Sequence, residues 1–164
     1  MRQFTCSQCG ESHEEDPTDS GWTLPDDVWN ISEEKRESEA TFNADLCKFG
    51  DRYFVRCMLP LPFQDREGYF GWGTWIEVEK TDFDTYINIY EKDGSNAPRI
   101  EGHLANEIPG YECPSLLNVE IQFGPSDQRP MVYFREDDSC LIAQEQRQGI
   151  DSIRYHEILD VIRS

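Results

Sequence analysis

Basic residues are scarce in this chain. It has 15 Lys and Arg against 33 Asp and Glu, and its formal net charge at pH 7 is −18. Such a surface repels the phosphates of nucleic acids and of anionic membranes, so we expect no nucleic-acid partner and no membrane partner. The same charge attracts a basic protein and speeds its association. A basic protein is therefore the expected partner, and solubility alone is the alternative explanation of the charge.

Long apolar runs are also lacking. No stretch approaches the roughly 20 apolar residues that a membrane-spanning helix needs. The N-terminal residues before Cys6 contain no apolar core of a secretory signal. We therefore expect a cytoplasmic protein, with residues 1–164 forming a single domain. In a reducing compartment the six cysteines are expected to bind a metal or to be buried, and not to form disulfides.

Familiar catalytic motifs are missing as well. The chain has no GxSxG, no HExxH and no glycine loop that could hold a phosphate. His103 could act as a base, with Cys113 ten residues later, but a lone histidine beside apolar residues is usually structural. The expectation leans against an enzyme, and we assign no catalytic residue.

The N-terminus carries a pattern typical of zinc binding. Cys6-Ser-Gln-Cys9 is followed by Gly10, a tight turn that brings two thiolates together. The predicted zinc ligands are Cys6, Cys9, His13 and Cys47. Cys57 or His103 could replace the last of these, and the alternatives are a reduced, metal-free cysteine pair or a redox site. A closed, cysteine-rich ligand set is typical of a structural zinc.

Between these ligands lies an acidic segment. Residues 11–45 contain twelve Asp and Glu and only two basic residues. Pro and Gly residues predict a loop interrupted by short helix, with a few apolar anchors: Trp22, Leu24, Val28, Trp29 and Ile31. Because such a segment lacks a core of its own, we expect the zinc to clip it to the rest of the chain. We divide the domain into residues 1–50, the knuckle and acidic loop, and the body 51–164.

The body alternates between strand and helix signals. Strands are predicted at residues 53–59, 72–79, 117–123 and 131–135, the first ending at Pro60 and Pro62. Helices are predicted after caps at Thr81 and Asp151, and at residues 141–148 before Gly149. This order predicts an α+β fold: a single domain with a mainly antiparallel sheet, flanking helices and an N-terminal zinc-knuckle-like turn.

Aromatic and acidic residues suggest a surface for the basic partner. Trp72 and Trp75 lie on opposite faces of one predicted strand. Burial in the core is the expectation for most Trp rings, but an exposed Trp beside acids would suit docking. The candidate partner-binding residues are Asp26, Asp27, Glu33, Glu34, Trp75, Glu77 and Glu79.

Several motifs occur in a recognisable order. They are Phe4-x-Cys6-x-x-Cys9-Gly10-x-x-His13, Asp45-Leu46-Cys47, Tyr53-Phe54-Val55-Arg56, Trp72-Gly73-x-Trp75, Gly102-x-Leu104-x-Asn106-x-x-Pro109-Gly110-Tyr111 and Ala143-x-Glu145-Gln146-x-x-Gly149-Ile150. Over nearly the whole chain this order resembles the bacterial domain-of-unknown-function family 2199. The resemblance implies a single-domain bacterial protein and supports Cys47 as a ligand, but it implies no activity. The chain departs from the pattern at Asp16-Pro17, where Leu-Pro is expected, and at Cys57, where Gly is expected.

Three classes of function remain. The preferred one is a non-catalytic acidic binding module with a structural zinc, such as an immunity or antitoxin-like inhibitor of a basic toxin. The second is an uncharacterised enzyme that uses Cys and His groups or an open zinc site, which a water or carboxylate in the fourth zinc position would favour. The third is a zinc-stapled structural or regulatory adaptor, in which removal of zinc would unfold the N-terminal third alone.

Overall fold

The computed structural model describes residues 3–5, 12–14, 18–111 and 118–163, and describes side chains from residue 18 onward. Its strands are β1 (Gln3–Thr5), β2 (Ser12–Glu14), β3 (Asp19–Gly21), β4 (Ala40–Phe42), β5 (Leu46–Phe49), β6 (Arg52–Pro62), β7 (Tyr69–Val78), β8 (Ile100–Leu104), β9 (Asn118–Gln122) and β10 (Met131–Phe134). Its helices are α1 (Asp26–Trp29), α2 (Glu33–Glu39), α3 (Lys80–Ile89), α4 (Leu141–Gln148) and α5 (Ser152–Arg163).

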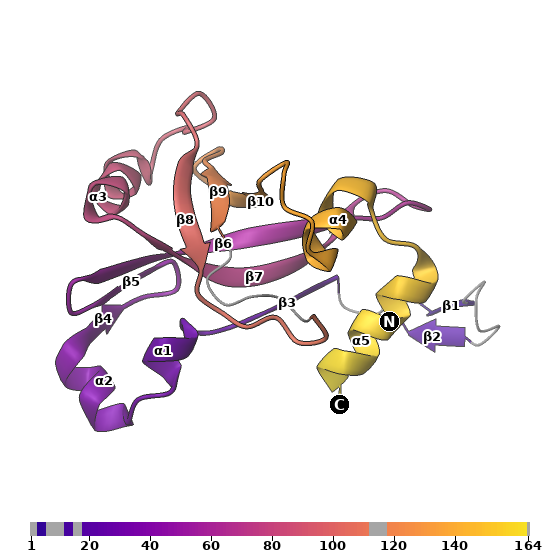
Figure 1. The fold of residues 1–164 in the computed structure, drawn as a ribbon, viewed down its shortest axis with the longest axis horizontal. Helices are drawn as coiled ribbons and strands as arrows, with labels where there is room; N and C mark the ends of the chain where they lie inside the picture. Colours follow the sequence, from indigo (N-terminus) through magenta and orange to yellow (C-terminus); the bar gives the residue numbers. More distant parts are fainter. Residues whose placement is uncertain (1–2, 6–11, 15–17, 112–117, 164) are drawn as a thin grey trace.

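Five strands form a closed ring in the order β6, β7, β8, β9, β10 and back to β6 (Figure 1). The β6–β7 ladder is the longest and runs from Tyr53↔Val78 to Pro62↔Tyr69. The pairings in the ring are antiparallel except the closing one, where Met131 of β10 pairs in parallel with Met58 of β6. Outside the ring, β3 adds to β7 in parallel, and β5 and then β4 extend the sheet from β6. The predicted α+β class is confirmed.

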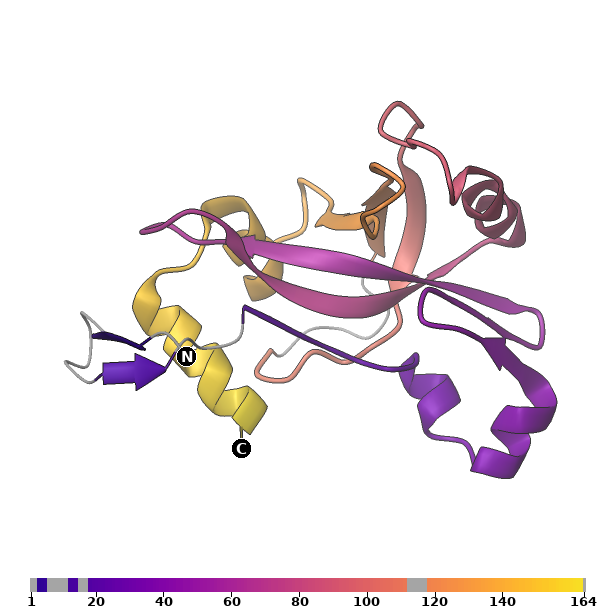
Figure 2. The ribbon, with the colours of Figure 1, turned by 180° about the vertical axis from the view of Figure 1, so that it is seen from behind.

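Two apolar clusters lie on opposite faces of the β6–β7 ladder because side chains alternate along each strand. The larger cluster fills the ring and includes Val55, Cys57, Ile76 and Val132, and it extends to residues of α3, α4 and α5. The smaller cluster lies on the outer face and consists of Leu24, Val28, Cys47, Phe54 and Trp75. Seen from behind, α1 and the chain before it run across this outer face (Figure 2).

The strand predicted over residues 53–59, ending at Pro60 and Pro62, includes both prolines and runs from Arg52 to Pro62. The carbonyl of Pro60 accepts a hydrogen bond from the Gln146 side chain, and that of Pro62 accepts one from Ile150 N. Both acceptors therefore face away from β7, and so do the two proline nitrogens. Because β10 pairs with β6 only at Met58, no ladder donor is needed there, and proline is tolerated on such an edge.

The C-terminal helices agree with the sequence patterns. Helix α4 has the predicted bounds and ends at Gly149, whose φ of 85° suits a residue without a Cβ. Asp151 caps α5 by accepting a hydrogen bond from Arg154 N at 2.8 Å. The predicted cap at Thr81 is wrong: α3 begins one residue earlier, at Lys80, and Thr81 lies inside it.

The two ends of the molecule are occupied by different parts of the chain. The β1–β2 hairpin lies beside α5, whereas α2, α3, β4 and β5 lie toward the opposite end (Figures 1 and 2). Among the described residues, no helix combines the length and the apolar character needed to cross a bilayer.

Candidate functional site

Residues 26–42 project from the body as one unit that we call the acidic arm. It comprises α1, α2 and β4 and carries six acidic residues and two basic ones. Four of the predicted partner-binding residues lie in it, namely Asp26, Asp27, Glu33 and Glu34. Helix α2 begins where the Ser32 hydroxyl accepts a hydrogen bond from Lys35 N, an N-cap that favours acidic residues in the first turn.

The base of the arm is fixed by Asn106, a buried residue that follows β8. Its Oδ1 accepts from Trp75 N at 2.8 Å and from the Thr74 hydroxyl at 3.1 Å. Its Nδ2 donates to the Leu24 carbonyl at 3.0 Å and to Asp26 Oδ1 at 2.9 Å. All the hydrogen-bonding positions of this amide are thus filled, which joins β7 to the start of α1. The predicted partner residue Asp26 is therefore an anchor of the arm.

The middle of the arm is held by Arg36. Its Nε donates to the Val28 carbonyl, and its Nη2 donates to the carbonyls of Trp29 and Ile31. The guanidinium also lies 5.1 Å from the centre of the Trp29 ring. The arginine of the arm is therefore bound to backbone carbonyls at and just after the C-terminal end of α1. Leu24 and Val28, two of the predicted apolar anchors, are buried in the outer cluster, whereas the polar contacts of Arg36 were not predicted from the sequence.

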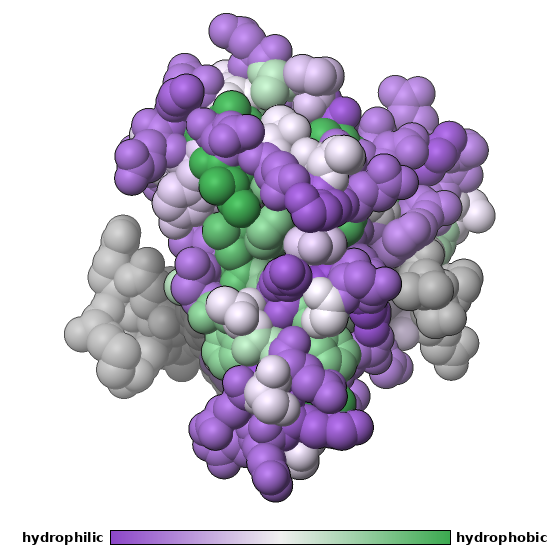
Figure 3. All heavy atoms as spheres, turned by 90° about the vertical axis from the view of Figure 1, so that its left-hand side faces the viewer, coloured by the Kyte–Doolittle hydropathy of each residue, from purple (hydrophilic) through white to green (hydrophobic). Residues whose placement is uncertain are grey.

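The outer surface of the arm combines apolar rings with carboxylates. Trp29 is 58% exposed and Phe42 is 45% exposed. The four glutamates of α2 are exposed, and none of them forms an ion pair with another residue in the part of the chain that the structure describes: Glu33, Glu34, Glu37 and Glu39. Figure 3 shows this side of the molecule, with hydrophilic atoms over the arm at the bottom of the view and hydrophobic atoms visible above it.

A second acidic group forms around Arg52 at the start of β6. Its guanidinium contacts both carboxylate oxygens of Glu77, at 3.0 and 2.8 Å, and Asp27 Oδ2 at 2.9 Å. The hydrogen bonds to Glu77 are the main cause of a raised pKa of Arg52. Asp27 and Glu77, two of the predicted partner-binding residues, therefore lie together, but both are paired with Arg52 of the same chain.

Glu77 also lines a cavity of about 660 Å³ beside the start of α3. Glu79 and Asp82 form one wall, and the pKa of Asp82 is raised by burial and then by the charge of Glu79. On the other side Glu101 and Glu120 lie directly opposite each other on β8 and β9. Like charges in this position cost stability.

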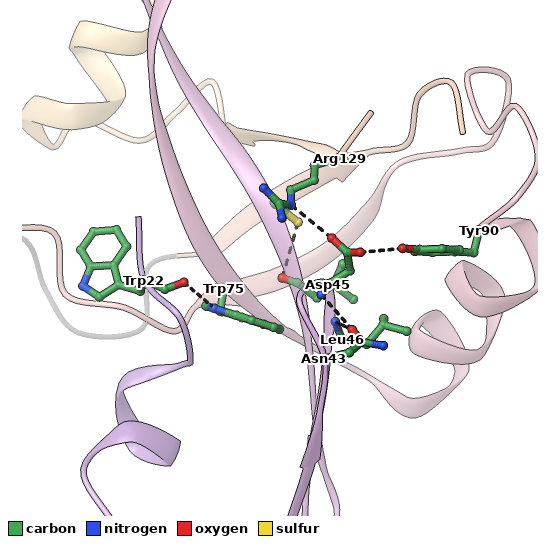
Figure 4. Close-up of polar contacts among 9 residues, drawn as sticks. Trp22, Asn43, Asp45, Leu46, Trp75, Tyr90 and Arg129 are labelled. Carbon is green, nitrogen blue, oxygen red and sulfur yellow. Dashed lines mark hydrogen bonds and ion pairs between the residues drawn. The ribbon is translucent and has the colours of Figure 1, made fainter. Parts of the chain in front are cut away.

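The predicted partner residue Trp75 is fully buried. Its ring belongs to the outer apolar cluster, and its Nε1 donates to the Trp22 carbonyl at 3.1 Å (Figure 4). Trp72 is 1% exposed and lies in the ring cluster, so the two rings do occupy opposite faces. Trp75 is covered because the chain before α1 crosses this face, and it belongs to the core and not to the docking surface.

The predicted zinc ligands are not gathered in the described part of the chain. Cys6 and Cys9 lie outside the described residues, and His13 is on β2, at the end of the molecule beside α5. Cys47 lies on β5, toward the other end, is fully buried, and burial raises its pKa to about 11. A buried thiol with a raised pKa resists the loss of its proton that zinc binding requires. Searching the described residues finds no group of three His, Cys, Asp or Glu side chains arranged for a metal.

Asp45 lies just before β5 and is hydrogen-bonded to three other segments: the end of α3, the chain before β10, and β6 (Figure 4). Its carboxylate accepts from the Tyr90 hydroxyl at 2.5 Å and from Arg129 Nε at 3.1 Å. Its backbone carbonyl accepts from Arg56 N at 2.9 Å. Both carboxylate oxygens are thus occupied, which favours a structural role beside the neighbouring cavity of about 540 Å³. Neither the acidic composition nor the Asp45-Leu46-Cys47 motif predicted this role of Asp45.

Asn106 and Arg36 were also missed as site residues. Asn106 stood in the quoted motif after Gly102, so its position could have been noticed, but its partners at Leu24 and Trp75 are far away in the sequence. The role of Arg36 depends on the end of α1, which had no clear signal because that helix has only four residues.

Comparison with known families gives one result. A family model described as an uncharacterized protein conserved in bacteria (DUF2199) matches residues 5–150. The chain belongs to this family. Comparisons with curated proteins and with solved structures found no match.

The residues that carry the DUF2199 resemblance in the C-terminal half have structural partners. Glu145 is bound by Arg154 Nε at 2.6 Å and by the Tyr111 hydroxyl at 2.6 Å. Gln146 bonds to backbone groups of β6 and β10. Glu145 and Gln146 of this motif therefore have structural roles in the fold.

Proposed function

We propose that this protein is a non-catalytic acidic binding module that docks on a basic protein through the acidic arm. In its concrete form it is an immunity or antitoxin-like inhibitor of a basic toxin. The proposal rests on one observation: the arm presents Trp29 and Phe42 at 58% and 45% exposure beside glutamates that have no cationic partner in the described chain.

The arm has the composition of an interface that binds through a few large side chains. Trp is enriched among residues that dominate binding energy, because its ring buries a large area at small entropic cost. The glutamates of α2 surround it with negative charge, which speeds association with a basic surface and is screened by salt. Arg36 forms no ion pair with them in the described chain, and its Nε and Nη2 donate to backbone carbonyls.

Reversing the charge of α2 tests the proposal. A pull-down with wild type first isolates the basic protein that it binds. The triple variant Glu33→Lys, Glu34→Lys, Glu37→Lys is expected to bind this protein at least tenfold more weakly than wild type does, as measured by calorimetry. The control variant Glu67→Lys, Glu91→Lys, Glu136→Lys changes the net charge equally at exposed positions outside the arm. It is expected to change the affinity much less.

Two results would contradict docking through the arm. One is equal loss of affinity in both triple variants, which would mean that net charge alone attracts the partner. The other is a wild-type affinity that does not fall between 50 and 500 mM salt, since exposed charges are screened over about 10 Å at 0.1 M.

We also propose that the protein holds a structural zinc through Cys6, Cys9 and His13, with a fourth ligand other than Cys47. The first three lie within eight residues of the chain and supply thiolate and imidazole donors of the kind that zinc prefers. The burial of Cys47 argues against it as a ligand. Its place in the apolar cluster is sufficient to explain why a cysteine is accommodated there.

Metal analysis distinguishes the two ligand sets. The purified protein is expected to contain about one zinc per chain, and Cys6→Ser or Cys9→Ser is expected to lose it. Cys47→Ala is expected to keep the zinc and to lose stability, by about 1–2 kcal/mol, because it leaves a small cavity. Loss of zinc in Cys47→Ala would restore the ligand set predicted from the sequence, and absence of zinc from wild type would refute both.

A further inference from the structure

Strand β4 ends the sheet on the side of the acidic arm. It pairs with β5 through Ala40↔Phe49, Thr41↔Lys48 and Phe42↔Cys47, and no described strand pairs with its other edge. At the opposite end of the sheet is β3, but residues 15–17 before it lie outside the described chain. In the described chain, β4 therefore has one paired edge and one open edge.

The hydrogen-bonding direction of each β4 residue follows from its neighbours. Gly50 N donates to the Glu39 carbonyl, and Asn43 N donates to the Leu46 carbonyl. In an antiparallel pair, residues that bond to the partner strand alternate with residues that face away from it. Thr41 therefore bonds to β5, and the backbone groups of Ala40 and Phe42 face the open edge.

One of these outward groups is already used. Ala40 N donates to the Arg36 carbonyl at the end of α2. The Ala40 carbonyl and both backbone groups of Phe42 have no partner among the described residues. An edge with a free donor between two free acceptors is a template for one more strand.

The side chains around this edge limit what can pair with it. Phe42 is 45% exposed, and Thr41 is exposed beside it. Glu37 and Glu39 are exposed immediately before the strand. A second copy of this chain would bring another 18 net negative charges to the same place, which opposes edge-to-edge self-association. An extended segment with Lys or Arg side chains has the complementary charge.

We propose that β4 binds its partner by strand addition, with an extended, basic segment of the partner as the added strand. This inference rests on the proposed function and names its mode of docking. Backbone hydrogen bonds to Phe42 and Ala40 fix the register, while basic side chains reach the glutamates of α2 and an apolar side chain covers the Phe42 ring.

The first test uses a synthetic probe, the peptide acetyl-Lys-Val-Lys-Val-Lys-Val-amide, titrated into the isotope-labelled full chain and followed by NMR. Binding is expected to slow hydrogen exchange of the Phe42 amide at least tenfold, while the Thr41 amide, already bonded to β5, changes little. A fully N-methylated version of the peptide keeps the charge and cannot donate backbone hydrogen bonds. It is expected to bind at least tenfold more weakly.

The second test removes the Phe42 donor itself. Both Phe42→Ala and Phe42→Pro lose the ring, but only the proline variant loses the outward N–H, and proline is tolerated on an open edge. Phe42→Pro is expected to bind the peptide about tenfold more weakly than Phe42→Ala. Thermal unfolding of both variants shows whether they remain folded, and the exchange measurement on wild type does not depend on them.

Equal affinity of the two peptides, or unchanged exchange at Phe42 in the bound state, would overturn strand addition. Docking of a basic protein on the arm would still stand in that case, because the charge-reversal variants of α2 test it separately. Failure of those variants together with slowed exchange at Phe42 would instead remove the electrostatic part of the proposed function and retain the pairing edge.

Discussion

Replacing Asn106 with Ala is expected to lower the free energy of unfolding by about 3–5 kcal/mol, because the backbone N–H of Trp75 and the carbonyl of Leu24 then lose their partner in a buried site. The side chain of Asn106 is 4% exposed, so water does not readily replace it. Because the same amide holds Asp26, the acidic arm is expected to loosen at its base. Chemical denaturation measures the loss, and hydrogen exchange in α1 measures the loosening.

The exposed Asn96 provides the matched control. Asn96→Ala is expected to change the stability by no more than about 0.5 kcal/mol. A loss of less than 1 kcal/mol in Asn106→Ala would show that the four hydrogen bonds of this side chain contribute little.

The variant Asn106→Asp adds a pH-dependent test of the same contacts. Its carboxylate would face Asp26 and the Leu24 carbonyl, which raises its folded pKa above the unfolded value of about 3.9. A raised folded pKa means that stability is greatest below the unfolded pKa and is lost as the pH rises toward the folded one. The difference in stability from wild type is therefore expected to grow between about pH 4 and pH 7.

Replacing Gln146 with Met is expected to cost about 3–4 kcal/mol, because this side chain closes the ring between β6 and β10. Its Oε1 accepts from Phe134 N at 2.8 Å, and its Nε2 donates to the carbonyls of Val132 and Pro60 at 2.8 and 3.3 Å. The two strands share only the Met131↔Met58 pairing, so the amide takes the place of ladder hydrogen bonds. Met has a similar length and is apolar, so the variant removes the hydrogen bonds without a large cavity.

Two measurements test this role of Gln146. Denaturation is expected to show the loss of stability, and hydrogen exchange of the Phe134 amide is expected to speed up more than that of amides in the β6–β7 ladder. Gln148→Ala changes an exposed residue on the same helix and is expected to have an effect within about 0.5 kcal/mol. If Gln146→Met and Gln148→Ala had equal stability, the proposed closure of the ring by Gln146 would be refuted.

Local patterns predicted those elements whose signals are local. The spacing of apolar residues and Gly149 predicted α4, and Asp151 predicted the start of α5. Strand β6 was predicted too short because proline was taken to end it, although both proline nitrogens face an edge without a ladder partner. Whether a backbone N–H is required at a position depends on the neighbouring strand, which a local pattern does not contain.

The candidate site was predicted in part. The acids of residues 26–34 do lie together on the arm, because they are close in sequence and share two short helices. Trp75 was misplaced on the partner surface because alternation gives two faces to a strand but does not say what covers each one. Arg36 and Asn106 were missed because their partners are backbone carbonyls and amides whose availability follows from the fold.

The sequence by itself determined the net charge of −18, the family and the α+β class, because these depend on composition and on short-range periodicity. The tertiary structure alone decided that Cys47 is buried, that Asn106 fixes the base of the arm, and that β4 has an open edge among the described residues. Each of these depends on contacts between residues that are distant in the chain. Burial and hydrogen-bond satisfaction are properties of such contacts, so they arise only when the chain has folded.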